Sequence, residues 1–222
     1  MCYRWTRKEG KENKKMKDQF TSFGGDFGKC IEFHGHACPG LAIGFQAARA
    51  LMERLEVGKA PDEELVAIVE TDACGADAIQ VMTRCTFGKG NFLFKDYGKH
   101  AFSLMDRGKR RGVRVCLQSD AIKMDPELLS LSDKVRRDEA SAKERERYGQ
   151  LQHGRTQKIL EMDVESLFKV EEIAAEIPHK ARIMKSEVCD FCGEPVAVTF
   201  LREIGGKRIC IPCAERQGSG KV

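Results

Sequence analysis

The spacing of apolar residues predicts a helix and then a buried strand in the first half of the chain. In LAIGFQAARALMERL, residues 41–55, apolar side chains recur at helical spacing, and Pro39 stands near the first turn, where its missing N–H costs little. ELVAIVET, residues 64–71, is rich in β-branched and apolar residues, which is typical of a buried strand. Apolar positions 78, 79, 81 and 82 then predict a short helix, opened by a turn at residues 72–75.

The second half begins with short strands and becomes strongly charged. NFLFKD, HAFSLMD and GVRVCLQ predict three consecutive short strands in an antiparallel part of a sheet. Residues 125–162 predict one or two long exposed helices, and residues 165–178 predict a strand that ends at Pro178. The order of elements predicts an α+β fold, with a mixed, largely antiparallel sheet and helices on one face.

Three parts of the chain differ in composition. Residues 1–18 are polar and rich in lysine, and they predict a disordered basic tail, in which either Met1 or Met16 is the start of translation. Residues 19–184 form the predicted α+β metal-binding domain, including the charged helical segment 125–162. Residues 185–222 form a separate small domain that contains four cysteines.

The small domain carries two CxxC pairs at the spacing of a four-thiolate zinc site. Cys189 and Cys192 form the first pair, Cys210 and Cys213 form the second, and 17 residues lie between the pairs. A turn at Gly205-Gly206 predicts a hairpin that returns the second pair to the first. A thioredoxin-like redox role would need a βαβ context that this segment lacks. The pattern therefore predicts a structural zinc ribbon or zinc finger.

FHGHACPGLAIG, residues 33–44, is either a metal-binding loop that opens a helix or a tight, hydrogen-bonded turn. Its histidines and cysteine alternate, so an extended backbone would bring them together and a helix would scatter them. A second Cys-Gly turn, TDACG, follows the predicted strand. We expect zinc or another divalent metal at His36, Cys38 and Cys74, with His34 and Cys85 as further candidate ligands. Three ligands would leave a fourth coordination position open.

Several polar residues near this loop are candidates for orienting a ligand. Asp72, Asp77 and Gln80 lie close to the Cys-Gly turn and could hold a ligand or a histidine N–H, although Asp72 fits a helix cap equally well. Lys89 and Lys99 belong to a glycine- and lysine-rich stretch that could meet an anionic ligand. That stretch lacks the order of a phosphate-binding loop, and hairpin turns explain its glycines equally well.

Composition narrows the classes of function. Of the 222 residues, 41% are hydrophobic and 32% are charged, and no apolar run approaches the roughly 20 residues that span a bilayer. The amino terminus lacks the apolar stretch of a secretory signal, so we expect a cytoplasmic protein. Ten cysteines in a reducing compartment indicate metal ligation or redox chemistry. A net charge of +4, from 38 basic and 34 acidic residues, is too even to favour nucleic acid.

Taken together, FHGHACPGLAIG, ETDACGADAIQVMTRCTFGKGNFLFKDYGKHAF, SLFKVEEIAAEIPHKARIMKSE and the terminal cysteine motif resemble the family named for the E subunit of molybdenum/tungsten formylmethanofuran dehydrogenase. The resemblance runs from about Phe20 to Cys213. It implies a core like the catalytic domain of glyceraldehyde-phosphate dehydrogenase, a homodimer and a metal near the HGHxCPG loop. Arg84 stands where the family usually has glycine.

The resemblance leaves two functions open. The complex that gives the family its name reduces carbon dioxide onto methanofuran, but its pterin, its molybdenum or tungsten and its iron–sulfur centres belong to other subunits. This sequence shows no pterin signature and no ferredoxin-type cysteine run, so neither cofactor is predicted here. We expect a metal-binding accessory or partner-docking subunit, linked to a molybdenum/tungsten enzyme or to one-carbon metabolism. The alternative is a metal-dependent enzyme that acts on a small anionic or carbonyl substrate at the open His/Cys site.

Overall fold

The structure is a computed structural model that describes residues 20, 25–174, 177–178 and 184–218. The chain divides into two compact units, Met1–Lys180 and Ala181–Val222. The predicted tail, residues 1–18, lies outside the described residues.

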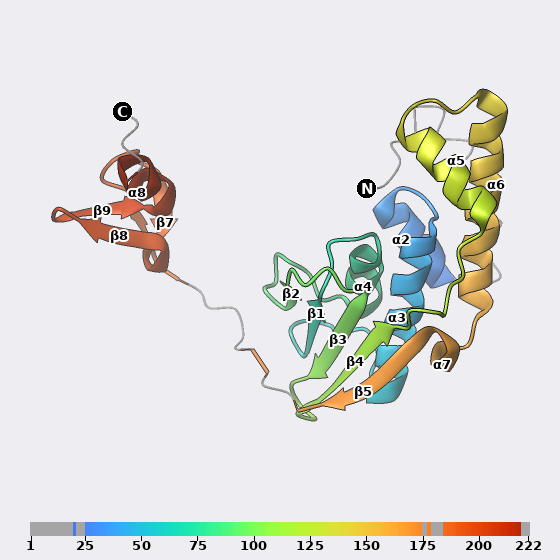
Figure 1. Cartoon of the computed structure of the whole chain (residues 1–222). Coiled ribbons are helices and arrows are strands. Elements are labelled where there is room, and N and C mark those ends of the chain that lie inside the picture. The colour runs from blue at the N-terminus through green and yellow to red at the C-terminus, as the bar shows by residue number, and fades with distance from the viewer. Residues whose placement is uncertain (1–19, 21–24, 175–176, 179–183, 219–222) are drawn as a thin grey trace. The chain divides into compact units, whose positions relative to one another are not determined.

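The first unit is built on a five-stranded sheet with the strand order β2-β1-β3-β4-β5 (Figure 1). In chain order the strands are β1 (Leu65–Val69), β2 (Phe92–Phe94), β3 (Ala101–Asp106), β4 (Arg111–Leu117) and β5 (Phe168–Ile173). β1 pairs with β2 in parallel, and the other neighbours pair antiparallel. The sheet is therefore mixed and largely antiparallel, as predicted.

One detail of the predicted sheet was wrong. Residues 91–96 were expected in an antiparallel run, but β2 lies parallel to β1. The reason is the connection between the two strands, which contains helix α4 (Gly75–Thr83). A helical crossover returns the chain to the end of the sheet at which the first strand began. The next strand then runs in the same direction as the first.

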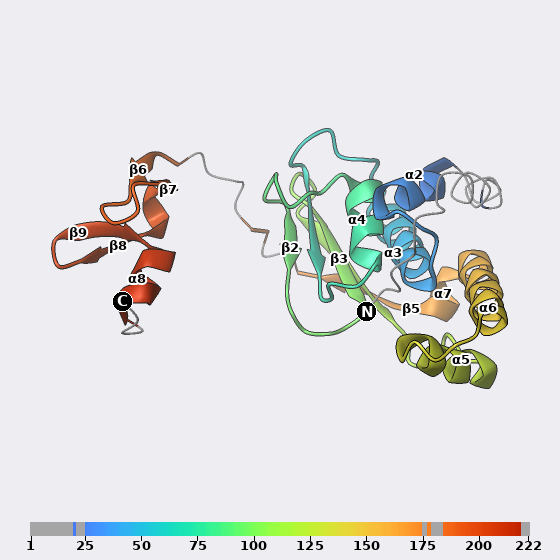
Figure 2. The same ribbon diagram turned by 90° about the horizontal axis from the view of Figure 1, so that it is seen from above.

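Helices cover one face of this sheet (Figure 2). The helices on this face include α2 (Gly25–His34), α3 (Pro39–Leu55) and α4, and they share a core with the alternate residues Leu65, Ala67 and Val69 of β1. The predicted helix over residues 41–55 is thus confirmed. The prediction contained no element at α2, although Phe27, Cys30 and Ile31 follow a helical spacing and are buried.

The opposite face of the sheet has a smaller apolar cluster. Val66, Ile68 and Met105 are buried there, and Ile177 packs against them from the chain beyond β5. The Arg107 side chain donates to the carbonyl oxygens of Glu63 and Pro178, which holds this returning segment in place. β1 is consequently buried on both faces, as its uninterrupted apolar run predicts.

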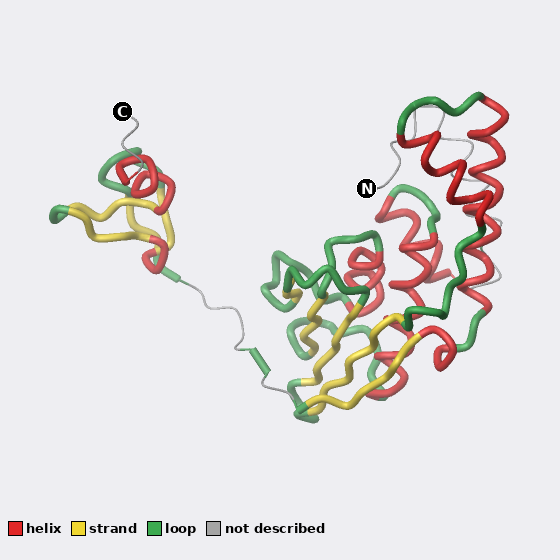
Figure 3. Tube along the Cα trace, in the orientation of Figure 1, coloured by secondary structure: helices red, strands yellow, loops and turns green. Residues whose placement is uncertain are grey.

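The charged segment forms two helices, α5 (Pro126–Arg136) and α6 (Ala142–Glu161), which are joined by a short turn (Figure 3). Asp125 caps α5, and Ser141 and Glu144 form a capping box at the start of α6. The helices are less exposed than predicted, because they bury apolar residues at helical spacing: Leu128, Leu131 and Val135 on α5, and Ile159 and Leu160 on α6. A one-turn helix, α7 (Val164–Leu167), leads into β5.

The second unit consists of two hairpins and a helix. The first hairpin pairs β6 (Ser186–Val188) with β7 (Pro195–Ala197), and a short 3₁₀ turn, η2 (Val198–Phe200), leads to the second, which pairs β8 (Leu201–Ile204) with β9 (Lys207–Cys210). The Gly205-Gly206 turn closes the second hairpin with positive φ angles of 59° and 74°. Helix α8 (Ile211–Gly218) follows. Within the described part of the chain, no helix is both long and apolar enough to span a membrane.

Arg84 adopts a backbone conformation that favours glycine. It ends α4 with φ 61° and ψ 14°, and its N–H donates to the carbonyl of Gln80. Left-handed backbone is strained for residues with a Cβ. We therefore expect Arg84→Gly to raise the free energy of unfolding by about 1 kcal/mol in urea denaturation.

Arg137 provides a matched control for this prediction. It is also an exposed arginine at a helix end, but its φ is −85°, so glycine relieves no strain there. Arg137→Gly should therefore lower the free energy of unfolding. Equal losses of stability in both variants would contradict the interpretation.

Candidate metal centre

The histidine–cysteine loop joins two helices of the first unit. α2 ends at His34, Gly35 turns the chain with φ 97°, and Cys38 is extended as the N-cap of α3. One ligand atom from each of His34, His36 and Cys38 lies within 4.8 Å of the other two, and all three residues are half-buried. The chain is thus folded here so that its alternating side chains converge, the arrangement that a metal-binding loop requires.

Cys38 stands at the amino-terminal end of a long helix. Its sulfur accepts a hydrogen bond from the backbone N–H of Leu41 at 3.4 Å, and Pro39 follows it in the first turn. The partial positive charge at a helix N-terminus favours a negative group there. The position therefore favours the thiolate form of Cys38, which is the form that binds metals.

His34 contacts every other member of the site. Its Nδ1 lies 2.7 Å from Oδ2 of Asp77, its Nε2 lies 3.9 Å from Sγ of Cys38, and its ring is 4.6 Å from that of His36. Hydrogen bonds with Cys74 and then with Asp77 raise the pKa of His34 to about 9 against the opposing effect of burial. Burial, and then the charge of His34, lower the pKa of His36. A metal at His34 would displace a firmly held proton, while His36 is readily neutral.

Glycines bring Cys74 to this loop by letting α3 and α4 touch. A Cβ on Gly44 would lie only 2.2 Å from the carbonyl oxygen of Gly75, and a Cβ on Gly40 would lie 3.2 Å from the Cβ of Cys74. Side chains at these glycines would push the two helices apart. The close packing sets Cys74, the N-cap of α4, beside His34.

The remaining candidates fall into two groups. Asp77 contacts the site through His34. Lys99 lies just beyond the carboxyl end of β1, the end that leads to Cys74, and its backbone N–H donates to the carbonyl of Glu70. Lys89 instead donates to the carbonyl of Asp62, at the opposite end of β1.

Three further candidates have different surroundings. Asp72 is exposed in the turn before α4, and Gln80 is half-buried further along that helix. Cys85 is fully buried beyond the far end of α4, where burial raises the pKa of its thiol. Among the described residues, the structure groups His34 with His36 and Cys38. Cys74 contacts His34 but is not part of that group, and Cys85 lies apart from it.

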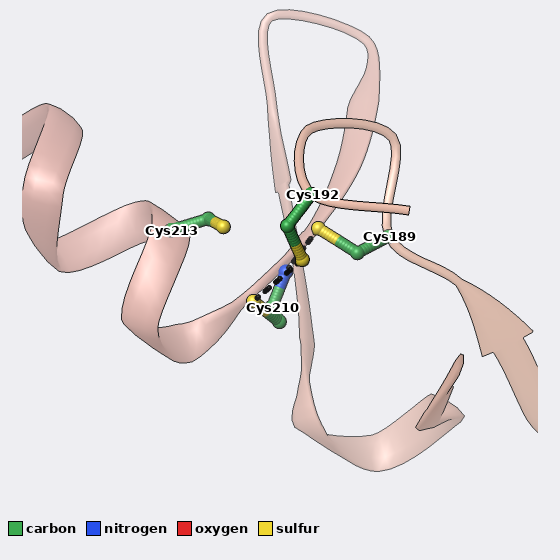
Figure 4. Close-up of side chains that lie close together, drawn as sticks. All are labelled: Cys189, Cys192, Cys210 and Cys213. Carbon is green, nitrogen blue, oxygen red and sulfur yellow. Dashed lines mark hydrogen bonds between the residues drawn. The ribbon is translucent and has the colours of Figure 1, made fainter. Parts of the chain in front are cut away.

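The second unit holds four cysteines whose sulfurs all lie within 4.8 Å of one another (Figure 4). Cys189 and Cys192 come from the turn after β6, Cys210 ends β9, and Cys213 lies in the first turn of α8. The sulfurs of Cys192 and Cys210 are 3.9 Å apart, and the N–H of Cys210 donates to the sulfur of Cys189. The sequence pattern contained no sign of helix α8.

The electrostatics of this cluster fit a bound cation. Backbone N–H groups, first that of Cys192, lower the pKa of Cys189 to about 6. The neighbouring sulfur of Cys210, followed by burial, raises the pKa of Cys213 to about 12. Four thiolates therefore cannot form together near neutral pH unless a positive ion compensates them, which is the role of zinc in four-cysteine sites.

The first unit also has a cavity of about 580 Å³, and none of its lining residues belongs to the histidine–cysteine loop. It is bounded by α3 and by the turn between α6 and α7, and Gln46, Arg49 and Met162 are among its lining residues. The Nε2 group of Gln46 lies 3.1 Å from the carbonyl oxygens of Ile159, Leu160 and Met162 at the end of α6, and its two hydrogens are shared among them. Its contacts explain Gln46 as a structural link between the helices.

Comparison with known proteins places these features in context. A family model described as "FmdE, Molybdenum formylmethanofuran dehydrogenase operon" matches residues 33–169. The crystal structure of an FmdE-like protein from Syntrophus aciditrophicus, which is similar to the E subunit of a tungsten formylmethanofuran dehydrogenase, matches this chain with a TM-score of 0.56 and 24% identity. That similarity covers 93% of this chain and 94% of the other, and it supports the fold.

A curated relative has a different name. A probable S-adenosyl-L-methionine-binding protein from Archaeoglobus fulgidus is 33% identical over 190 residues, which is 82% of this chain. The matched region is 50% of that protein, so this chain spans about half the length of its relative. The family model covers more than half of the chain, including the histidine–cysteine loop, strands β1 to β4 and the first residues of β5. The chain therefore belongs to the FmdE family.

Proposed function

We propose that this chain is a cytoplasmic metal-binding protein that serves as an accessory or partner-docking subunit in a molybdenum/tungsten enzyme system or in one-carbon metabolism. The observation that carries the proposal is the convergence of His34, His36 and Cys38 on one loop, beside Cys74. The FmdE family supports the link to that enzyme system. The proposal includes the assembly of two copies of this chain into a homodimer.

The donor set fits zinc or another divalent metal of similar softness. Two imidazoles and a thiolate are ligands that zinc prefers, and Cys74 is the adjacent candidate for a fourth. If Cys74 stays outside the coordination sphere, the fourth position is open to a small molecule. The four cysteines of the second unit form a separate, closed zinc site, which we assign a structural role and a part in docking.

The open position also supports a second candidate function, that of a metal-dependent enzyme. A metal with a free position can polarise a carbonyl or bind an anion. Within this chain, Cys38 and the linked His34–Asp77 pair could hold or move a proton, and Lys99 lies at the same end of the sheet. We favour the accessory role because the family to which the chain belongs is described by a molybdenum formylmethanofuran dehydrogenase operon.

Metal content of the full chain tests the proposal. Elemental mass spectrometry on protein purified without an affinity-column metal should find about two metal ions per chain. Cys38→Ser should retain about one, because the four-cysteine cluster is untouched.

Cys116→Ser is the matched control for this experiment. Cys116 is a half-buried cysteine on β4 that belongs to neither cluster, so the variant should keep the wild-type metal content. Wild-type protein with a single ion, unchanged by Cys38→Ser, would refute the site in the first unit. The Archaeoglobus relative is named as a probable S-adenosyl-L-methionine-binding protein. Binding of S-adenosyl-L-methionine to this chain is therefore a separate experiment.

A further inference from the structure

The contact between Asp77 and His34 joins two helices at the edge of the proposed metal site. Asp77 lies in the first turn of α4, and its Oδ2 is 2.7 Å from Nδ1 of His34, the last residue of α2. The His34 side chain is only 11% exposed, whereas that of Asp77 is 35% exposed. The imidazole is thus largely shielded from water, and the carboxylate is its nearest hydrogen-bond acceptor at Nδ1.

This contact determines which ring nitrogen faces the other ligands. A carboxylate accepts a hydrogen bond, so Nδ1 of His34 carries a proton. Once the proton on Nε2 leaves, the lone pair of the neutral ring is on Nε2. Nε2 is the atom that lies 3.9 Å from the sulfur of Cys38. The ring is therefore oriented with its metal-binding nitrogen toward the cysteine.

We propose that Asp77 is a positioning residue, which holds His34 so that Nε2 binds the metal of the first unit; this inference rests on the proposed function. Metal-binding histidines commonly donate their second N–H to a carboxylate, which fixes the ring and increases its basicity. The inference makes His34 a ligand in its own right. It also distinguishes Asp77 from the nearby Asp72, which is exposed.

The position of Asp77 links it to Cys74. The two residues lie three positions apart, so a single turn of α4 supplies both the sulfur and the carboxylate beside His34. The backbone contact between Gly44 and Gly75 fixes this turn against α3. Asp77 is therefore held by the fold and does not depend on a flexible loop for its place.

Cobalt binding to the full chain tests the inference. With zinc in the four-cysteine cluster, cobalt is titrated into the first unit and its thiolate charge-transfer absorption is recorded, with Cys38→Ser identifying the signal. Asp77→Ala should weaken the affinity about 10- to 100-fold. Asp77→Asn keeps an acceptor without the charge and should weaken it less, by about tenfold. Asp72→Ala, the charge control, should change it less than about twofold.

A second readout separates positioning from a purely structural role. Cadmium binding to chain with isotope-labelled histidine should show NMR coupling between the metal and Nε2 of His34. The four-cysteine cluster offers no nitrogen ligand and adds no such coupling. Asp77→Asn should retain this coupling, and Asp77→Ala should lose it or move it to Nδ1.

The outcomes are distinguishable. Absence of a cobalt signal that depends on Cys38 in the wild type would refute the proposed metal site itself. A normal wild-type signal with unchanged affinity in both Asp77 variants would overturn the role of Asp77 alone. If Asp77→Ala does not fold, Asp77→Asn decides the question, because affinity equal to the wild type would also overturn it.

Discussion

Removal of metal from the four-cysteine cluster is expected to unfold the second unit completely. Its buried core consists of Cys189, Ile209, Cys210 and Cys213, so three of the four buried residues are proposed metal ligands. A unit of this size cannot bury enough apolar surface to fold unaided. Metal binding in small zinc domains supplies about 10–16 kcal/mol, most of which is folding free energy. Two-dimensional amide NMR with a chelator should show the dispersed signals of residues 184–218 collapse.

The first unit is the internal control for this experiment. Its core contains residues from the sheet and from helices α2, α3, α4 and α6, and it includes none of the four cysteines. Signals from β1, β3 and β4 should therefore keep their dispersion after chelation. Cys213→Ser should reproduce the effect of the chelator. A second unit that stays folded without metal would show that its hairpins are stable by themselves.

Gly44→Ala is expected to be the most damaging glycine-to-alanine substitution among the described glycines of the first unit. The added Cβ would lie 2.2 Å from the carbonyl oxygen and 2.4 Å from the Cα of Gly75, and both are backbone atoms that cannot rotate away. α3 and α4 would have to separate, which would open the core and move Cys74 away from the loop. We expect a loss of about 3 kcal/mol or more in the free energy of unfolding.

Gly154→Ala is the control for the Gly44 substitution. Gly154 is also inside a long helix, but it is exposed, and a Cβ there meets no atom within 4 Å. Alanine should stabilise α6 by about 0.5–1 kcal/mol, because it is the better helix former. Urea denaturation of both variants measures the contrast. If Gly44→Ala unfolds at the wild-type urea concentration, the helices are not in backbone contact.

Local patterns predicted most of the elements of the first unit. The periodicity of residues 41–55 and the apolar run of residues 64–71 gave α3 and β1, because in both segments burial follows the spacing that the chain imposes. The direction of β2 could not be predicted in the same way. It depends on where the crossover through α4 delivers the chain, which is a property of the sheet as a whole.

The candidate site was predictable only in part. Alternation in HGHAC indicated that His36 and Cys38 could converge on an extended backbone. They do converge, but through a turn at Gly35 after the helical His34, with only Cys38 extended. The Asp77–His34 contact joins residues 43 positions apart and needs both helix ends in place. Cys85 illustrates the converse: a cysteine close in sequence to the site is carried away from it by the length of α4.

The position of β5 at the edge of the sheet has a consequence for the order of folding. Only α4 and β2 lie between β1 and β3, and only a short turn lies between β3 and β4. By contrast, β5 pairs with β4 only after α5, α6 and α7 have been traversed. Closing such a long loop is slow compared with forming neighbouring strand pairs. We therefore expect the side of β4 that pairs with β5 to stay unpaired while the rest of the sheet forms. During synthesis, that edge stays open to pairing with other chains until β5 emerges and covers it.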